Sequence, residues 1–120
     1  MNHYCCIISV IEPEGTGTRF TILVARTNYR IDKPNALEWD PPIVGTVTSL
    51  AKNIKQESTS YVHAFAITMC QQIEQAIRRG TFPNLDLVIP DTLVRQLMRT
   101  PMPDYIGQHP QGMIAYTFSV

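Results

Sequence analysis

The sequence predicts an α/β fold, with α+β as the alternative, built on a single mixed sheet of four to five strands. Two β-rich runs at the N-terminus, 3–12 and 19–27, are joined by a short glycine-containing turn. A long apolar pattern of helical period covers 60–79, and an alternating apolar run covers 113–120. We therefore expect an N-terminal antiparallel hairpin, a long helical crossover packed on the sheet and a C-terminal strand.

The first and last strands differ in how many of their faces are apolar. The first run, HYCCIISVIE, is apolar on both faces, which favours a strand that is covered on both sides. The closing run alternates, which is typical of a half-buried strand, with Ile114, Tyr116 and Phe118 on one face. The sheet is therefore expected to bury its N-terminal strand more completely than its C-terminal one.

The size and charge of the chain limit the kinds of function that it can have. At 120 residues it is expected to form a single domain, 1–120, with a core that needs no disulfide or metal. Ten basic and ten acidic residues cancel, so neither nucleic acid nor a membrane is an expected partner. The chain has no apolar run near the roughly 20 residues that span a bilayer, and its start lacks the basic region of a signal peptide. We expect a soluble cytoplasmic protein.

The three cysteines, Cys5, Cys6 and Cys70, do not have the spacing of a zinc site. Neighbours Cys5 and Cys6 would point to opposite faces of a strand, so they cannot easily share a partner. In a reducing compartment all three are expected to be free buried thiols. No other pattern indicates a metal or a cofactor, and we expect neither.

The residues between the hairpin and the first helical pattern, 28–44, contain three prolines. Proline removes a backbone donor and favours extended geometry in the residue before it. We expect a surface loop with a short strand at 29–32. Trp39 in this loop either pins the loop to the domain or anchors an interface, where tryptophan is enriched.

Residues 46–57 carry apolar side chains at helical spacing, so we predict a helix there. Without a break, one helix over 46–79 would be about 50 Å long, which exceeds the roughly 30–35 Å diameter of such a domain. The serines and threonine at 58–60 favour a break and a new helix start. The apolar stripe of the first helix consists of Val47, Leu50, Ala51 and Ile54.

The first half of the second helix is apolar on nearly all sides. One face of a sheet covers only one side of such a helix, so the rest requires another helix or a second copy of the chain. The low charge content and the methionines also favour an adaptable contact surface. We therefore expect a homo-oligomer, most simply a dimer. The candidate interface residues are Trp39, Tyr61, Phe65 and Met69.

Residues 85–90 (LDLVIP) predict a short strand, and Asp91 is expected to cap a helix over 92–100. The long connection favours a right-handed crossover to a parallel strand, and α/β sheets bind ligands beyond the carboxyl ends of such strands. Asp91 would repel an anion and no glycine is present, so a structural corner stays the alternative. The candidate ligand-binding residues are Asp91, Thr92, Arg95 and Arg99, with His109 from the following loop.

No catalytic or cofactor motif is recognisable, and the acidic residues are scattered along the chain. The first hypothesis is a small soluble, non-enzymatic binding or interaction protein that acts as a homo-oligomer and contacts a protein partner. The second is a small nucleotide- or phosphate-ligand-binding protein, or an enzyme, that uses the corner at Pro90-Asp91 with Arg95 and Arg99. Enzymatic activity stays open, and the sequence favours the first hypothesis.

Overall fold

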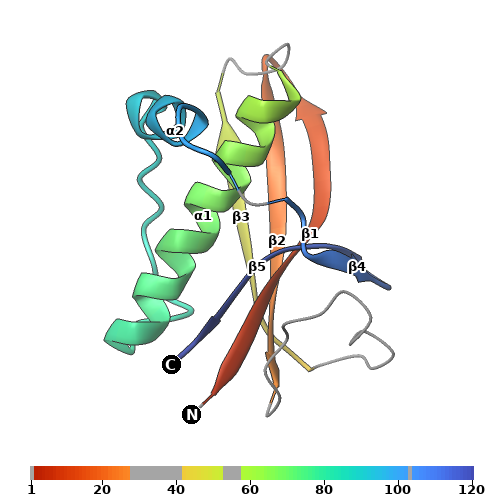
Figure 1. Cartoon of the computed structure of the whole chain (residues 1–120), viewed down its shortest axis with the longest axis vertical. Helices are drawn as coiled ribbons and strands as arrows, with labels where there is room; N and C mark the ends of the chain where they lie inside the picture. Colours follow the sequence, from red (N-terminus) through yellow and green to blue (C-terminus); the bar gives the residue numbers. More distant parts are fainter. Residues whose placement is uncertain (1, 28–41, 53–57, 103) are drawn as a thin grey trace.

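The computed structural model describes residues 2–27, 42–52, 58–102 and 104–120. A five-stranded sheet carries one long helix on one face (Figure 1). This confirms the predicted class, with its N-terminal hairpin, long helix on the sheet and C-terminal strand. The strand order is β3-β2-β1-β5-β4, and all four pairings are antiparallel, unlike the mixed sheet that the sequence predicts. The elements are β1 (His3–Glu14), β2 (Gly17–Thr27), β3 (Ile43–Ala51), α1 (Thr59–Arg79), α2 (Asp91–Met98), β4 (Gly107–His109) and β5 (Gly112–Ser119).

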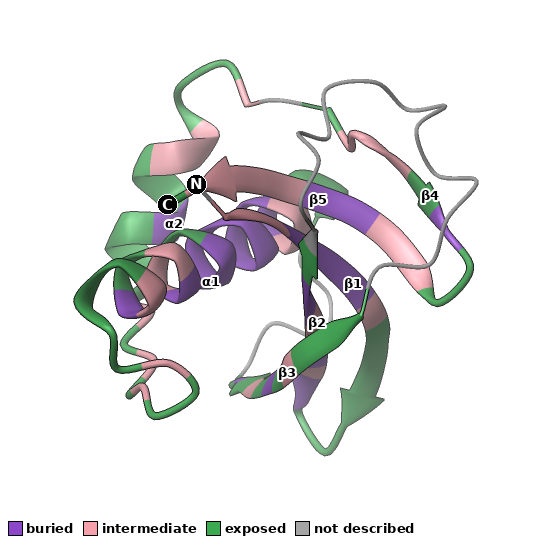
Figure 2. Cartoon of the chain, turned by 90° about the horizontal axis from the view of Figure 1, so that it is seen from below, coloured by how far each residue is buried: buried purple, intermediate pink, exposed green. Residues whose placement is uncertain are grey.

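The β1–β2 hairpin forms as predicted, and its turn contains Gly15 at φ +59°, a conformation that glycine adopts without strain. Both faces of β1 are buried at residues 5–8, within the part of the strand that Figure 2 shows in purple. Cys6 packs with the residues of α1, and Cys5 packs on the opposite face with Ile7. The two neighbouring thiols therefore point to opposite faces, as expected.

The sequence prediction is wrong at β3, where the chain forms a strand and not the helix expected over 46–57. Val47 and Ala51 are buried while Thr48 and Leu50 are exposed, so the burial has the period of two of a strand. The apolar stripe fits a helix, but β-branched residues favour the extended chain, and β2 supplies a partner with Ile22 opposite Val47. Ile54, the strand expected at 29–32 and Trp39 lie outside the described residues.

The long helix α1 begins where the cap residues at 58–60 predict. The side chain of Ser58 accepts a hydrogen bond from the Tyr61 N–H at 3.2 Å, which satisfies one of the free donors of the first turn. Gly80 ends the helix at φ +74°, and its N–H bonds to the carbonyl oxygen of Ile77 at 3.1 Å. No helix in the described part of the chain is long and apolar enough to cross a membrane.

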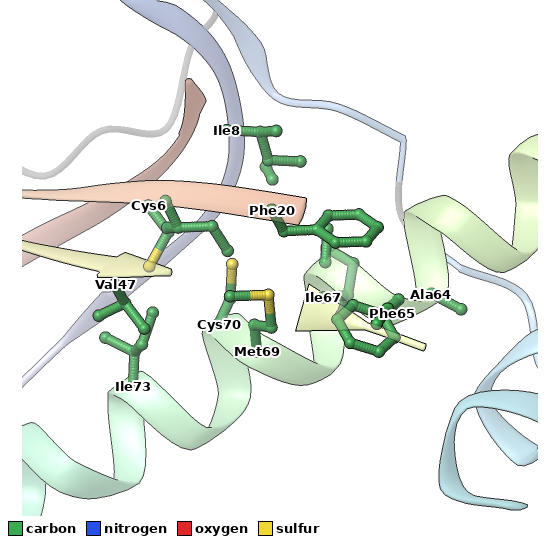
Figure 3. Packing of buried hydrophobic residues seen from close by; sticks show 14 of the residues in the cluster. Cys6, Ile8, Phe20, Val47, Ala64, Phe65, Ile67, Met69, Cys70 and Ile73 are labelled. Carbon is green, nitrogen blue, oxygen red and sulfur yellow. The ribbon is translucent and has the colours of Figure 1, made fainter. Parts of the chain in front are cut away.

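The apolar first half of α1 is covered within one chain. On the sheet side it meets β1, β2 and β3, and the rings of Phe20 and Phe65 stack at 4.6 Å between centroids (Figure 3). On its other sides it packs against residues 85–89, α2, Met102 and Tyr105. Of the two covers that the sequence allows, another helix or a second copy, the structure has the first, so the apolar first half of α1 no longer argues for a homodimer. The core residues of this half are Tyr61, Ala64, Phe65, Ala66, Ile67, Thr68, Met69 and Cys70.

The strand predicted over 85–90 does not form. These residues pair with none of the described strands, yet Leu85, Leu87 and Ile89 are half-buried while their neighbours are exposed. Such alternation is that of an extended chain, here packed on the core without a sheet partner. The predicted parallel crossover is therefore wrong. The chain instead passes from β3 at one edge of the sheet to β4 at the other.

The short helix α2 starts one residue earlier than predicted. Asp91 is its first helical residue, Pro90 takes the N-cap position, and no side chain caps the helix. The predicted capping role of Asp91 is wrong because its carboxylate bonds to other side chains. Val94 is the fully buried residue of α2.

A β-bulge changes the predicted alternation of β5. The pairing with β1 shifts at Ala115, because Cys6 lies opposite Tyr116 and Ile7 lies opposite Ile114. A bulge places two residues of one strand opposite one residue of its partner and interrupts the alternation. Ile114 therefore joins the cluster of Ile7 on the face away from α1, while Tyr116 packs against the α1 cluster. The three residues expected on one face are divided between two.

Candidate functional site

An open groove runs along the edge of β3, between that strand and the chain that leads into α2. We call it the edge groove and define it by residues 46–52 on one wall and 83–95 on the other. It consists of two adjoining cavities of about 510 and 450 Å³, which share Ser49, Leu50 and Leu87. Figure 2 shows β3 and the chain before α2 as two separate segments next to α1. Tyr61 and Phe65 of α1 line the first cavity.

The β3 wall is the edge of the sheet. Among the described residues β3 pairs with β2 alone, so its other side faces the groove. In an antiparallel pair, every second residue of an edge strand directs its N–H and C=O away from the neighbouring strand. This wall is therefore a row of backbone donors and acceptors that an extended chain can pair with.

The opposite wall is an extended chain that side chains hold in place. The Gln72 amide of α1 accepts a hydrogen bond from the Val88 N–H at 3.0 Å and donates one to its carbonyl oxygen. Leu87 and Ile89 pack against the core, whereas Val88 is 68% exposed. Residues 46–50 face 83–87 and residues 49–52 face 87–95, so the two walls run in the same direction.

An aromatic contact closes one end of the groove. A Cβ added to Gly45 would lie 2.3 Å from the Phe82 ring, so this ring rests directly against the backbone of β3. Glycine permits that close approach because it has no side chain. The walls therefore meet at Gly45 and Phe82 and separate toward the start of α2.

The other end carries a polar cluster at the start of α2. The Tyr61 hydroxyl donates a hydrogen bond to Asp91 at 2.6 Å, and Arg95 Nε donates to the second carboxylate oxygen at 2.7 Å. The Arg95 guanidinium also lies 4.9 Å from the centroid of the Tyr61 ring, in cation–π distance. The hydrogen bond from Tyr61 and then that from Arg95 lower the pKa of the Asp91 carboxyl. Asp91 therefore stays ionised, and Lys52 adds a second cation to this end.

The structure brings together two of the five candidate ligand-binding residues, Asp91 and Arg95. Thr92 on α2 and Arg99 at its C-cap are exposed and line neither cavity. His109 is buried in β4, at the opposite edge of the sheet, where its Nδ1 accepts a hydrogen bond from the Gln111 N–H at 3.0 Å. The structure thus has a cavity at the predicted corner, but only two of the five expected side chains line it.

The candidate interface residues offer little surface to a partner. Tyr61, Phe65 and Met69 are at most 5% exposed, and all three belong to the core around α1. Trp39 lies outside the described residues. Tyr61 and Phe65 contribute to the floor of the edge groove, a role that sequence reasoning missed. The groove lies between two segments that are distant in the sequence, 46–52 and 83–91. No local sequence pattern indicates that these segments face each other.

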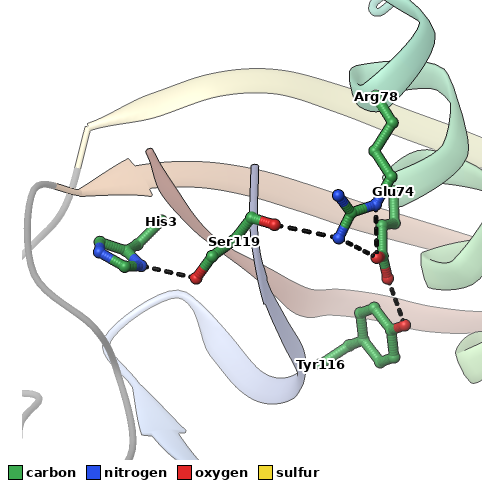
Figure 4. Close-up of polar contacts among 5 residues, drawn as sticks. All are labelled: His3, Glu74, Arg78, Tyr116 and Ser119. Carbon is green, nitrogen blue, oxygen red and sulfur yellow. Dashed lines mark hydrogen bonds and ion pairs between the residues drawn. The ribbon is translucent and has the colours of Figure 1, made fainter. Parts of the chain in front are cut away.

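A polar network at the opposite end of α1 was also missed. Glu74 accepts hydrogen bonds from the Tyr116 hydroxyl and from Arg78 Nε, the latter at 2.9 Å (Figure 4). Arg78 also donates to the Ser119 carbonyl oxygen at 3.0 Å, and the Ser119 hydroxyl lies 2.7 Å from His3 Nδ1. Burial and then Glu74 raise the pKa of Tyr116, so this phenol stays protonated. The network ties β1 and β5 to α1.

The three cysteines are built into the core. The hydrogen bond with Cys70 and burial raise the pKa of the Cys6 thiol, and burial raises that of Cys5 to about 12. Protonated buried thiols are poor nucleophiles. His63 lies against the Tyr105 ring at 4.3 Å between centroids. No group of three or more His, Cys, Asp or Glu in the described ranges could hold a metal ion.

Comparisons with known proteins add no identity. No family model, no curated protein and no solved structure matches the chain. The edge groove is therefore the feature from which a function can be inferred.

Proposed function

We propose that this chain is a non-enzymatic binding protein that takes an extended peptide segment of a partner into the edge groove, as a strand added to β3. The observation that carries the proposal is the alternating, sheet-free chain at 85–89, which faces the edge of β3 across an open groove. A peptide has alternating backbone donors and acceptors that complement such an edge, and proteins bind peptides by adding a strand in this way. Side chains of the groove then supply specificity.

The length and shape of the groove favour a single extended segment. Residues 46–52 span about 20 Å from the first residue to the last at roughly 3.3 Å per residue, the length of a seven-residue strand. In a second copy of this chain, β3 is already paired to β2 on one side and is flanked by residues 83–91 on the other. Its β3 therefore has no open side with which to enter the groove. A linear segment with both edges open fits between two walls, so the expected occupant is a peptide.

The test uses a random linear peptide library displayed against the full chain, followed by affinity measurement of the selected peptides by fluorescence anisotropy. Leu50 lines both cavities, so Leu50→Ala should weaken binding about tenfold through lost apolar contact. Ile11→Ala is the matched control, because Ile11 and Leu50 are 42% and 43% exposed and Ile11 lies outside the groove. Failure to select any peptide that distinguishes these two variants would overturn the proposal.

The homo-oligomer that the sequence predicts is tested separately on the same protein. Light scattering of the free chain at micromolar concentration is expected to give the mass of a monomer. A dimer that dissociates in Leu50→Ala, and not in Ile11→Ala, would indicate that a second copy occupies the groove in place of a peptide.

A second candidate function is binding of a small anion at the α2 end of the groove. It is favoured by Lys52 and Arg95, which line the same cavity of about 510 Å³. It is disfavoured by Asp91, whose carboxylate already binds Arg95 at 2.7 Å and leaves Lys52 as the main cation for an anion. A thermal-shift screen with pyrophosphate and adenine nucleotides tests it. A rise in melting temperature that Lys52→Ala abolishes would favour the anion over the peptide.

A further inference from the structure

The edge groove has charges of opposite sign at separate points along its length. Lys52 and Arg95 are two cations at the α2 end, and Asp91 is the one carboxylate there, which leaves a net charge of +1 among the described lining residues. Further along, Asp86 is the only charged residue among the described residues that line the second cavity. A bound peptide would therefore meet positive potential at one point and negative potential at the other.

The carboxylate of Asp91 does not cancel the whole positive charge at the α2 end of the groove. Its two oxygens already accept hydrogen bonds from Tyr61 and Arg95. Lys52 makes no ion pair with any residue in the described part of the chain, and its side chain is in an exposed position at the mouth of the cavity. Lys52 is thus the cation that is available to an acidic group of a ligand.

The direction of the walls fixes the direction of the peptide. Both walls run from the Phe82 end toward α2, and every strand pair of the sheet is antiparallel. Antiparallel pairing is also slightly more stable per residue than parallel pairing. A peptide antiparallel to β3 is antiparallel to residues 85–89 as well. Its N-terminal part then lies beside Lys52, and its C-terminal part lies beside Asp86.

The spacing of the two charges sets the spacing of the ligand's charges. Ser49, Leu50 and Leu87 line both cavities, so Leu87 lies opposite Ser49 and Leu50. Because the two walls run in the same direction, Asp86 lies near Thr48 along the groove. Thr48 and Lys52 are separated by about 13 Å along a strand, at roughly 3.3 Å per residue. Residues four apart on an extended peptide lie on one face at the same separation.

We propose that the edge groove selects an extended peptide with an acidic side chain at its N-terminal end and a basic side chain about four residues later. This inference rests on the proposed peptide-binding function and adds the direction and the charge pattern of the ligand. The acidic group contacts Lys52, and the basic group contacts Asp86. Because these contacts lie at the rim, they determine orientation and choice of partner more than they determine affinity.

The experiment compares three forms of one selected peptide, each acetylated and amidated so that the termini carry no charge. The first has Glu at the N-terminal point and Lys four residues later, the second has the two exchanged, and the third has Gln at both. We expect the first to bind about tenfold more tightly than the second, with the third between them. The difference should shrink as salt is added, since rim charges are screened.

A charge-reversed variant makes the test reciprocal. In Lys52→Glu/Asp86→Lys, the exchanged peptide should become the tighter ligand and the first the weaker one. Equal affinities for all three peptides, or a preference for the exchanged peptide in the wild type, would overturn the charge pattern while leaving peptide binding intact. If none of the three binds, the proposed function itself fails and the charge pattern falls with it.

Discussion

The side-chain amide of Gln72 pairs with the backbone of Val88, accepting from its N–H at 3.0 Å and donating to its carbonyl oxygen. A helix residue here takes the place of a neighbouring strand, because it satisfies both backbone groups of an extended residue. The pairing holds residues 83–91 at the outer wall of the edge groove. It also explains how the chain before α2 stays extended without belonging to the sheet.

Replacing Gln72 tests this anchoring. In Gln72→Ala the amide of Val88 should exchange with deuterium at least tenfold faster, and the free energy of unfolding should fall by about 1 kcal/mol for the two lost hydrogen bonds. Exchange of the Val88 amide by NMR and urea unfolding measure the two effects. Gln75→Ala, on the same helix and with an exposed side chain, is the control and should change neither. Equal protection of Val88 in both variants would contradict the role assigned to Gln72.

The contact between Gly45 and Phe82 predicts a second effect. A methyl group in Gly45→Ala would overlap the Phe82 ring, so the ring must move and the closed end of the groove should loosen. We expect a loss of about 1 kcal/mol in the free energy of unfolding, at the low end for overpacking because a ring can shift. In a Phe82→Leu background the same substitution should cost less. A cost that is the same in both backgrounds would show that the ring does not rest on Gly45.

The Tyr61–Asp91 hydrogen bond predicts a change in an acid titration. In Tyr61→Phe the pKa of Asp91 should rise toward the ordinary value of 3.8, because the first cause of its lowered pKa is removed. A lowered folded-state pKa gives stability that is present above 3.8 and is lost as the pH falls through the folded value. The variant should therefore lose less stability in acid than the wild type. NMR titration of the carboxyl carbon measures the pKa, with Tyr4→Phe as the control that leaves it unchanged.

The burial of His63 predicts a loss of stability at mildly acidic pH. Burial lowers the pKa of this imidazole from 6.5, against a smaller opposing effect of Asp104. The unfolded chain thus binds the proton more readily, and stability is complete above pH 6.5 and falls as the pH drops from there toward the folded value. His63→Phe keeps a ring against Tyr105 and removes the titration. Urea unfolding between pH 7.5 and 5 should show a smaller decline for the variant, and parallel declines would contradict the assignment.

The sequence predicts the elements better than their pairing. The hairpin, α1 with its start near Ser58, and β5 follow from local periodicity and caps, which depend on neighbouring residues alone. β3 is missed because Val47 and Ala51 fit a helical stripe and a strand face equally well, and only the partner β2 decides between them. The strand expected at 85–90 has strand composition, but a groove separates it from the free edge of β3, so it packs as an extended wall.

The candidate site is partly predictable for the same reason. The corner at Asp91 was identified because a strand-like run precedes a helix, and Arg95 follows because it lies one turn further on α2. Tyr61 and Lys52 reach the same place from distant parts of the chain, and no spacing in the sequence relates them to Asp91. The sequence favours a homodimer because it does not reveal that residues 85–89 and α2 cover the second side of α1.

Amide hydrogen exchange along β3 tests the central claim most directly. A selected peptide is added to the full chain, and the protection of each amide from residue 46 to residue 50 is measured with and without it. If the peptide adds a strand, every second amide in this range should gain at least tenfold protection, while the alternate amides, already bonded to β2, should change little. Unchanged exchange along the whole of β3 in the presence of saturating peptide would contradict strand addition at this edge.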